Sequence, residues 1–353
     1  MLMLLGVLKK DISLTAKPNP GLHLCNGVFA KLVLPVRPNY ETEGNTMSLY
    51  PPPPIIETEA FAELPSAFRK TGVRSQWAAS NNKGETIHSF LEGPSFDRDG
   101  NLYVVDIPWG RIFRIGPRGD FDLIAEYDGE PNGLKIHKDG RIFIADYKNG
   151  IMVLDPASGA VTPYCDRYRV EGLKGVNDLV FGSNGDLFFT DQGLTGLHDP
   201  TGRVYRLRPD GNLQPLIENG PSPNGLVLDP TENWLYVAMT RANQVWRLPL
   251  LADGGTTKVG AFLQLSGGSG PDGMAMDADG NVVVCHAGAG SVLIFSPIGE
   301  PLYRIRSCSG LFPTNTAYGG PGNRTLYITE SESGTILRAD VPVPGRRMFS
   351  HEA

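Results

Sequence analysis

Six side chains with oxygen donors recur at one position of a repeated pattern, and together they could hold a cation. Each opens a short apolar stretch and carries a carboxylate or a carboxamide; they are Glu92, Asn132, Asn177, Asn224, Asp272 and Asn315. Strand caps are also commonly Asn or Asp, which is the simpler interpretation. A cap does not require an acid, however, and burying Glu92 or Asp272 without a partner would cost several kcal/mol. A bound ion at this position is therefore expected.

The segments that these residues open share one order of polar and apolar positions. The segment EGPSFDRDGNLYVVD begins at Glu92 and NGLVLDPTENWLYVA begins at Asn224, and the steps between the six starts are 40, 45, 47, 48 and 43 residues. Each unit contains two strands around an Asp, Asn or Gly turn, then a third strand such as 202–207 and a fourth such as 121–127. Four strands per repeat of this length are typical of a propeller blade.

The repeats predict an all-β fold, a six-bladed β-propeller with four antiparallel strands per blade. The sixth repeat ends after three strands near Arg338, and 55–64 is the segment expected to supply its fourth. Closing the ring in this way pairs both edges. We place the propeller at 47–340, a C-terminal tail at 341–353, and a weakly ordered extension, or sequence upstream of a start at Met47, at 1–46.

The innermost strand of a blade lines the central channel, so the six starting residues should form a ring at one mouth. Glu92, Asn177, Asn224 and Asp272 would supply oxygen ligands and leave positions open for water or substrate. Oxygen ligands favour Ca²⁺ first, with Mg²⁺, Mn²⁺ or Zn²⁺ as alternatives. Asn132 and Asn177 could also contact a substrate.

A second set of polar residues should return to the same mouth at the end of the next strand. It comprises Asp106, Asp146, Asp191, His286 and Glu330, and the fourth repeat breaks the series with Met239. For the acids we expect mainly hydrogen bonds to nearby loop backbone. His286 and the mouth-loop residues Trp109, Tyr147 and His198 are expected to contact substrate, with packing between blades as the alternative.

Four short motifs stand in the same order as in one known family. They are EGPSF at 92–96, VND at 176–178, SPNGL at 222–226 and GPDGM at 270–274. Over 55–338 the sequence resembles the senescence-marker-protein/gluconolactonase/regucalcin family. The resemblance implies one axial divalent metal held by Glu92, Asn224 and Asp272, with Asp272 also as the base and Asn177 on metal or substrate. The substrate-contacting arginines of that family match no residue here.

The resemblance and the ring together imply a metal-dependent hydrolase that opens a lactone, either a sugar lactone or a related cyclic ester. Two alternatives remain: a phosphotriesterase using the same ring, and a non-catalytic binding propeller. The sequence contains no H-E-x-x-H, no phosphate-binding loop and no G-x-S-x-G. A Ser/His/Asp hydrolase is therefore not expected.

Charge and composition narrow the choice of partners and location. The net charge of −6 gives no electrostatic reason to expect nucleic acid or an anionic membrane. The four cysteines are scattered, which favours a reduced, cytoplasmic protein, and we expect a monomer or a small homo-oligomer. Three long connections, 66–91, 165–176 and 192–202, should form a partial lid over the metal and set the size of the lactone.

Overall fold

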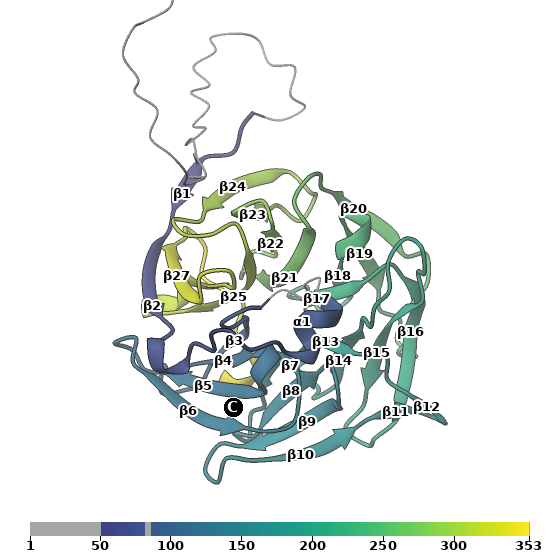
Figure 1. The fold of residues 1–353 in the computed structure, drawn as a ribbon. Coiled ribbons are helices and arrows are strands. Elements are labelled where there is room, and N and C mark those ends of the chain that lie inside the picture. The colour runs from purple at the N-terminus through teal and green to yellow at the C-terminus, as the bar shows by residue number, and fades with distance from the viewer. Residues whose placement is uncertain (1–50, 82–85, 353) are drawn as a thin grey trace, which may run out of the picture. The chain divides into compact units, whose positions relative to one another are not determined.

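Six antiparallel sheets surround a common axis as the blades of a propeller (Figure 1). The computed structural model describes residues 51–81 and 86–352, so the expected extension at 1–46 lies outside the described residues. The innermost strands contact one another in the order β3, β7, β13, β17, β21 and β25, and β25 returns to β3. The expected six-bladed propeller is thereby confirmed, with the channel lined by these six strands.

Blades 1 to 4 each take four consecutive strands from the axis outward. Blade 1 has β3 (Leu91–Phe96), β4 (Leu102–Asp106), β5 (Arg111–Ile115) and β6 (Phe121–Glu126); blade 2 has β7 (Pro131–Ile136), β8 (Ile142–Asp146), β9 (Gly150–Asp155) and β10 (Ala160–Cys165). Blade 3 has β13 (Val176–Phe181), β14 (Leu187–Asp191), β15 (Gly202–Leu207) and β16 (Leu213–Gly220); blade 4 has β17 (Pro223–Leu228), β18 (Trp234–Met239), β19 (Gln244–Pro249) and β20 (Gly260–Gln264).

Blades 5 and 6 are completed from the N-terminal side. Blade 5 has β21 (Gly270–Met276), β22 (Val282–Ala287), β23 (Ser291–Phe295) and β24 (Pro301–Arg306), with β1 (Ile55–Glu57) added outside them; blade 6 has β25 (Pro313–Gly319), β26 (Thr325–Glu330), β27 (Thr335–Asp340) and β2 (Glu59–Glu63). The strand β2 pairs antiparallel with β27, which confirms the expected closure of the ring.

The closing segment serves two blades rather than one. The sequence predicted a single strand at 55–64, but the chain divides at Thr58: β1 runs parallel to β24, and only β2 joins blade 6. The hydroxyl of Thr58 explains the division, because it donates to the carbonyl of Arg306 at 2.9 Å and accepts from the amide of Cys308 at 2.9 Å. The segment therefore ties blade 5 to blade 6.

Acidic turns close the hairpins on the face away from the ring. In blade 1, Oδ1 of Asp97 accepts the backbone amides of Asp99 and Asn101, at 2.9 and 2.8 Å. Gly100 completes this turn with φ +81°, a conformation that other residues rarely adopt. In blade 5, Asp277 accepts the amides of Asp279 and Asn281 in the same way. These contacts explain the recurring D-x-D-G-N signal of the repeats.

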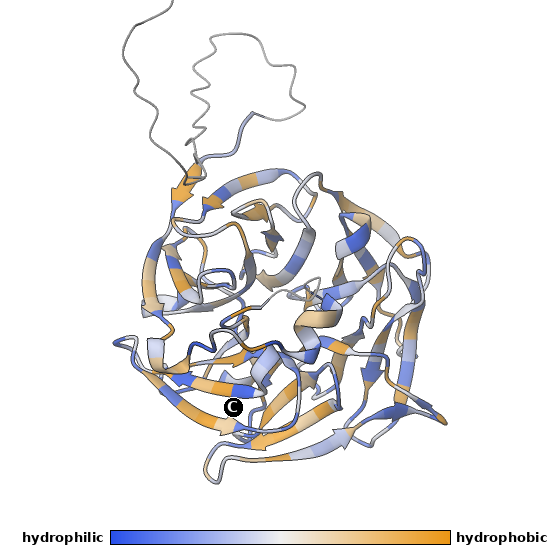
Figure 2. Ribbon diagram, in the orientation of Figure 1, coloured by the Kyte–Doolittle hydropathy of each residue, from blue (hydrophilic) through white to orange (hydrophobic). Residues whose placement is uncertain are grey.

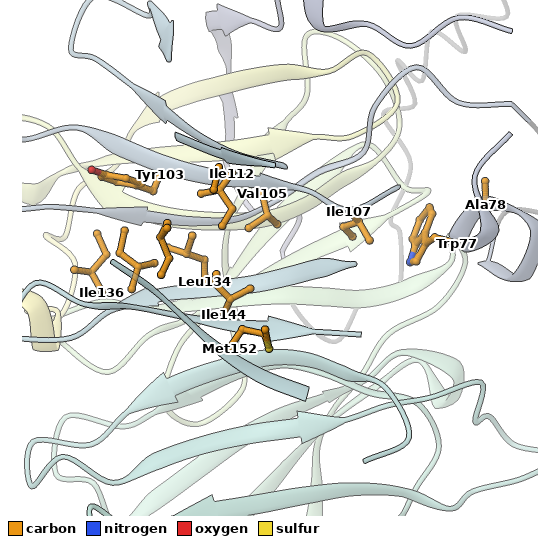
Figure 3. Packing of buried hydrophobic residues seen from close by; sticks show 13 residues of the cluster. Trp77, Ala78, Tyr103, Val105, Ile107, Ile112, Leu134, Ile136, Ile144 and Met152 are labelled. Carbon is orange, nitrogen blue, oxygen red and sulfur yellow. The ribbon is translucent and has the colours of Figure 1, made fainter. Parts of the chain in front are cut away.

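Apolar clusters between neighbouring blades form the core, and Figure 2 shows the hydrophobic colouring concentrated on the strands. The cluster of blades 1 and 2 extends to helix α1 (Gln76–Asn81), whose Trp77 and Ala78 are buried against it (Figure 3). The ring of Trp77 lies 4.8 Å from that of Phe90, between centroids. This packing fixes α1 close to the point where β3 begins.

Short elements complete the described chain. They are the 3₁₀ turns η1 (Ser66–Phe68), η2 (Ile107–Trp109), η3 (Thr240–Ala242), η4 (Pro321–Asn323) and η5 (Phe349–His351), and the small hairpin of β11 (Arg167–Tyr168) and β12 (Glu171–Gly172). The terminal segment packs below the channel, where Phe349 stacks on Phe181 with 5.0 Å between ring centroids. None of the helices within 51–81 and 86–352 has the length and apolar character of a membrane-spanning segment.

Candidate metal centre

Each ring residue lies where the innermost strand of its blade departs from regular pairing. In blade 1, Glu92 pairs with Val105 but the next pair is Ser95 with Tyr103, so the inner strand carries one extra residue. The inner strands of the other five blades shift register at the corresponding place. A bulge turns a side chain out of the regular alternation of a strand. Five of the six ring side chains are thus placed by one repeated backbone device. In blade 6 the shift falls between Pro313 and Asn315, so Thr314 holds the equivalent position and Asn315 stands one residue later, as Asp178 does in blade 3.

Glycines that follow the ring residues let neighbouring inner strands approach closely. A Cβ on Gly225 would lie 2.4 Å from the carbonyl oxygen of Asp272, and a Cβ on Gly273 would lie 2.2 Å from Oδ1 of Asn315. Blade 3 has Asp178 at this position instead of glycine. Its carboxylate therefore enters a narrow part of the channel, where it joins the acids of the ring.

Three carboxylates are brought together at this mouth. Burial, followed by the charge of Asp272, raises the pKa of Glu92 well above its usual range. Burial also raises the pKa of Asp178, and it raises that of Asp272 despite a hydrogen bond from Asn224 and the charge of Arg241. Each acid therefore carries its negative charge at an unfavourable cost.

The cations available within the described chain do not balance these acids. The ammonium of Lys135 lies 4.0 Å from Oδ1 of Asp178. No lysine or arginine among the described residues forms an ion pair with Glu92 or Asp272. Both hydrogen bonds to Glu92, from the Gly93 amide at 2.7 Å and from Asn315 at 2.8 Å, reach the same oxygen, Oε2. The Oε1 atom of Glu92 remains available for a cation.

Amide side chains complete the set of oxygens that a divalent ion requires. Nδ2 of Asn177 donates to Oε1 of Gln192 at 2.9 Å, and the amide of Asn224 donates to Asp272. These bonds leave the carbonyl oxygens of both amides free for an ion. Within 51–81 and 86–352, no group of three or more His, Cys, Asp or Glu residues is placed to hold a metal by itself. The fit therefore depends on Glu92, Asp272 and the two amides together, a donor set that suits a hard cation.

The remaining ring residues have different surroundings. Asn132 is buried. Its backbone carbonyl oxygen would lie 2.7 Å from a Cβ on Gly93, which places Asn132 beside Glu92. The amide of Asn315 points at two acids and donates to both, at 2.8 Å to Glu92 and 3.4 Å to Oδ2 of Asp178. Asn315 therefore screens two carboxylates from each other.

The acids at the ends of the second strands cap loops, as the sequence predicted. Asp191 accepts the amides of Lys174 and Gly175 at 2.7 and 2.8 Å, and Asp106 accepts the amide of Phe90 at 2.7 Å and pairs with Arg111. Asp146 and Glu330 accept loop amides in the same manner. These buried residues hold the mouth loops in place.

The four side chains expected to meet substrate differ in position. His198 lines a mouth pocket together with Gln192, the partner of Asn177. The ring of Tyr147 instead covers Gly175, and its hydroxyl is buried without a hydrogen-bond partner in the described chain. Nε1 of Trp109 is also buried without a hydrogen-bond partner among the described residues. Nε2 of His286 lies 3.0 Å from the carbonyl of Gly267, and burial lowers the pKa of this histidine.

The long connections come together on the side of the ring residues. Their pocket has a volume of about 480 Å³ and is lined by Ser80, Asn81, 192–198, Ser222 and Arg241. The third connection contacts the second, because Nζ of Lys174 donates to the carbonyl of Thr201 at 2.8 Å. The third connection thus lies beside Asn177, through Gln192, and the expected lid over the metal stays a prediction.

Sequence reasoning did not assign a site role to Asp178, Gln192 or Arg241. For Asp178 a signal was present, since it is the acid that occupies the position where four other repeats have glycine. The places of Gln192 and Arg241 depend on loops outside the repeat. Arg241 lies on η3, directly after the strand that ends with Met239.

Comparison with known proteins shows the family of the chain. Residues 90–332, which include the whole ring, match the model of the SMP-30/gluconolactonase/LRE-like region. Lactonase drp35 of Staphylococcus aureus strain MRSA252 is 34% identical over 275 residues, 70% of this chain and 81% of that protein. Lactonase drp35 of Staphylococcus epidermidis is 31% identical over 299 residues, 76% of this chain and 87% of that protein.

Solved structures with lower identity show the same fold. A putative gluconolactonase superposes with a TM-score of 0.66 at 23% identity, covering 83% of this chain and 94% of its own. Regucalcin of Agrobacterium tumefaciens, described as a calcium-binding protein, gives a TM-score of 0.68 at 21% identity, covering 85% and 99%. From its sequence match and its propeller, the chain belongs to the SMP-30/gluconolactonase/LRE-like family.

Proposed function

We propose that the protein is a divalent-metal-dependent lactonase, a hydrolase that opens a cyclic carboxylic ester. The observation that carries the proposal is the group of Glu92, Asp178 and Asp272, three acids at one mouth of which only Asp178 has an ion-pair partner, Lys135, among the described residues. Family membership and the relatives named lactonase drp35 support the same reaction class.

The ion would be held by Glu92, Asn224 and Asp272, with Asn177 on the ion or on the substrate. Ca²⁺ is the first candidate, because all the donors are oxygens, and Mg²⁺, Mn²⁺ and Zn²⁺ are the alternatives. When bound, a divalent ion supplies positive charge that polarises an ester carbonyl. Glu92 is only 3% exposed, so its role is to hold the ion rather than to touch substrate.

Asp272 is the acid that can reach a substrate, since it is only partly buried at the mouth. Its carboxylate would take a proton from the attacking water, or attack the ester carbon directly. The hydrogen bond from Asn224 orients this carboxylate, and the nearby charge of Arg241 favours its ionised form. Asp272 is therefore proposed as the catalytic residue.

The test uses the full chain, a panel of lactones and a phosphotriester. We expect lactone hydrolysis that disappears after chelation and returns with Ca²⁺. Preferential hydrolysis of the phosphotriester would replace the proposed reaction with phosphotriester cleavage. A protein that hydrolyses none of these substrates, and whose stability a chelator leaves unchanged, would indicate a non-catalytic binding propeller.

A cytoplasmic location and a monomeric or small homo-oligomeric state remain predictions from the sequence. Cell fractionation and light scattering on the purified chain test them.

A further inference from the structure

The mouth pocket lies directly beside the candidate metal centre. Gln192 belongs to its wall and accepts a hydrogen bond from Asn177 of the ring. On the other side of the pocket, Ser80 and Asn81 belong to α1, which the buried Trp77 anchors to the core (Figure 3). A substrate whose ester lies at Asp272 would therefore extend into a pocket with fixed walls.

Three polar residues of the pocket lining, Gln192, Thr195 and Ser222, hydrogen-bond to one another. Nε2 of Gln192 donates to the hydroxyl of Ser222 at 2.9 Å. The hydroxyl of Thr195 donates to the carbonyl of Gln192 at 2.6 Å and accepts the amide of Ser222 at 3.2 Å. Thr195 and Ser222 are also buried. These three residues are poorly placed to recognise the many hydroxyls of a sugar lactone, which leaves Ser80, Asn81, His198 and Arg241 as the polar contacts of the lining.

Two leucines of the same wall remain uncovered. Leu194 is 63% exposed and Leu197 is 71% exposed, although both line the pocket. The turn that carries Leu197 is held by reciprocal hydrogen bonds between Gly196 and Asp199, at 3.0 and 3.1 Å. Apolar surface that is held in place at the mouth of a pocket gains free energy when an apolar group covers it.

A cation separates this apolar wall from the ring. Cγ of Arg241 would lie 3.6 Å from a Cβ on Gly196, so its stem lies beside the turn that carries Leu197. Its charge acts on Asp272, and the described residues that line the pocket include no acid. The order from the ring outward is thus carboxylate, guanidinium and leucines, which matches a ligand with one polar and one apolar end.

We propose that this pocket is a subsite for an aliphatic substituent, and that the substrate is an alkyl-substituted lactone rather than a polyhydroxylated sugar lactone. The ester would lie at Asp272 and the chain would cover Leu194 and Leu197. This inference rests on the proposed lactonase function and specifies its substrate class.

The first experiment measures kcat/KM for γ-butyrolactone, γ-hexanolactone, γ-octanolactone, γ-decanolactone and glucono-δ-lactone with Ca²⁺ present. Because burying one methylene contributes up to about 0.8 kcal/mol, kcat/KM should rise by up to about four-fold per added methylene until the pocket is filled. Glucono-δ-lactone should be the poorer substrate. Equal values along the series, or a preference for glucono-δ-lactone, would overturn the inference.

The second experiment removes the apolar wall in the double variant Leu194→Ser/Leu197→Ser. The ratio of kcat/KM for γ-decanolactone over γ-butyrolactone should fall by about ten-fold or more. The matched control is Ile298→Ser, which changes a 78% exposed residue of the β23–β24 turn, on the far face, and should keep the ratio. A ratio that survives the double variant would place the chain elsewhere and refute this subsite.

The two proposals fail in different ways. A protein that hydrolyses no lactone with any divalent ion contradicts the proposed function itself. A protein that hydrolyses lactones without the alkyl dependence contradicts only the subsite. Because both leucines are exposed, the double variant should unfold within a few degrees of the parent. A substitution Leu197→Lys, which places a charge on the same wall, provides a second variant and should lower the same ratio.

Discussion

Asn315 and Asp178 approach each other across the channel, from blades that face one another in the six-membered ring. Nδ2 of Asn315 lies 3.4 Å from Oδ2 of Asp178 while it donates to Glu92 at 2.8 Å. The mouth is therefore narrow enough for one amide to serve two acids. The charge balance of the ring therefore depends on acids and amides from opposite blades.

Replacing Asp272 with Asn should remove catalysis while keeping the fold. The amide keeps the size of the side chain but can neither accept a proton nor attack an ester, so kcat should fall by at least about a hundred-fold. Asp279→Asn, in the exposed turn at the far end of the same blade, is the control and should be fully active. A near-normal kcat for Asp272→Asn, measured with a good lactone and saturating Ca²⁺, would show that another group is the base.

Replacing Glu92 with Gln should have opposite effects with and without metal. In the metal-free protein the change removes one of the repelling acids, so the free energy of unfolding should rise by about 1 kcal/mol or more. In the presence of Ca²⁺ the variant should lose most of the metal-dependent increase in Tm, because a ligand has been weakened. Thermal unfolding with chelator and with Ca²⁺ measures both effects. Equal increases in Tm for parent and variant would remove Glu92 from the metal site.

The metal-free protein should become less stable as the pH rises from about 4 to about 7. Burial raises the pKa of Glu92 and brings that of Asp272 to about 7, so between the unfolded and folded pKa values the folded state binds more protons. Its stability is greatest below this window and is lost through it. Ca²⁺ needs the ionised acids, so its affinity should increase over the same range. Thermal unfolding and calorimetric titration across pH check both slopes; a flat metal-free profile contradicts the assignment.

Replacing Arg241 with Gln should affect both substrate binding and the pH profile. The guanidinium lowers the pKa of Asp272, so its removal should shift the acid limb of kcat/KM against pH to higher pH. Loss of a contact in the pocket should also raise KM by several-fold. Arg241→Lys should restore the position of the acid limb, because the charge is kept. Arg118→Gln, on an exposed turn of the far face, should leave the profile where it is.

The sequence repeat made the strands and the number of blades predictable. The contacts between different repeats could not be predicted from it. The third strand at 202–207 was predicted to the residue, because apolar stretches between turn residues repeat in every blade. The division of the closing segment at Thr58 was not predictable, since it depends on hydrogen bonds to residues about 250 positions away.

The candidate site shows the same limit. The ring residues follow from the repeat, so Glu92 and Asp272 could be proposed from the sequence alone. Asp178 is one position from the periodic residue, and only its meeting with Asn315 across the channel shows that it shares the same charge balance. Arg241 and Leu197 lie in connections that no repeat constrains, and their common pocket is formed by the three-dimensional arrangement of those loops.

The segment formed by β1 and β2 also governs when the protein can finish folding during synthesis. Its partners leave the ribosome later, β24 about 250 residues and β27 about 280 residues after it, which at about 5–20 residues per second is roughly 12–56 s. During that period blade 1 lacks its ring neighbour, blade 6, and the unpaired edges of β1 and β2 are exposed to other chains. The protein is therefore most prone to pair with other chains while it is being translated, and codons that slow the ribosome before β27 would prolong this period.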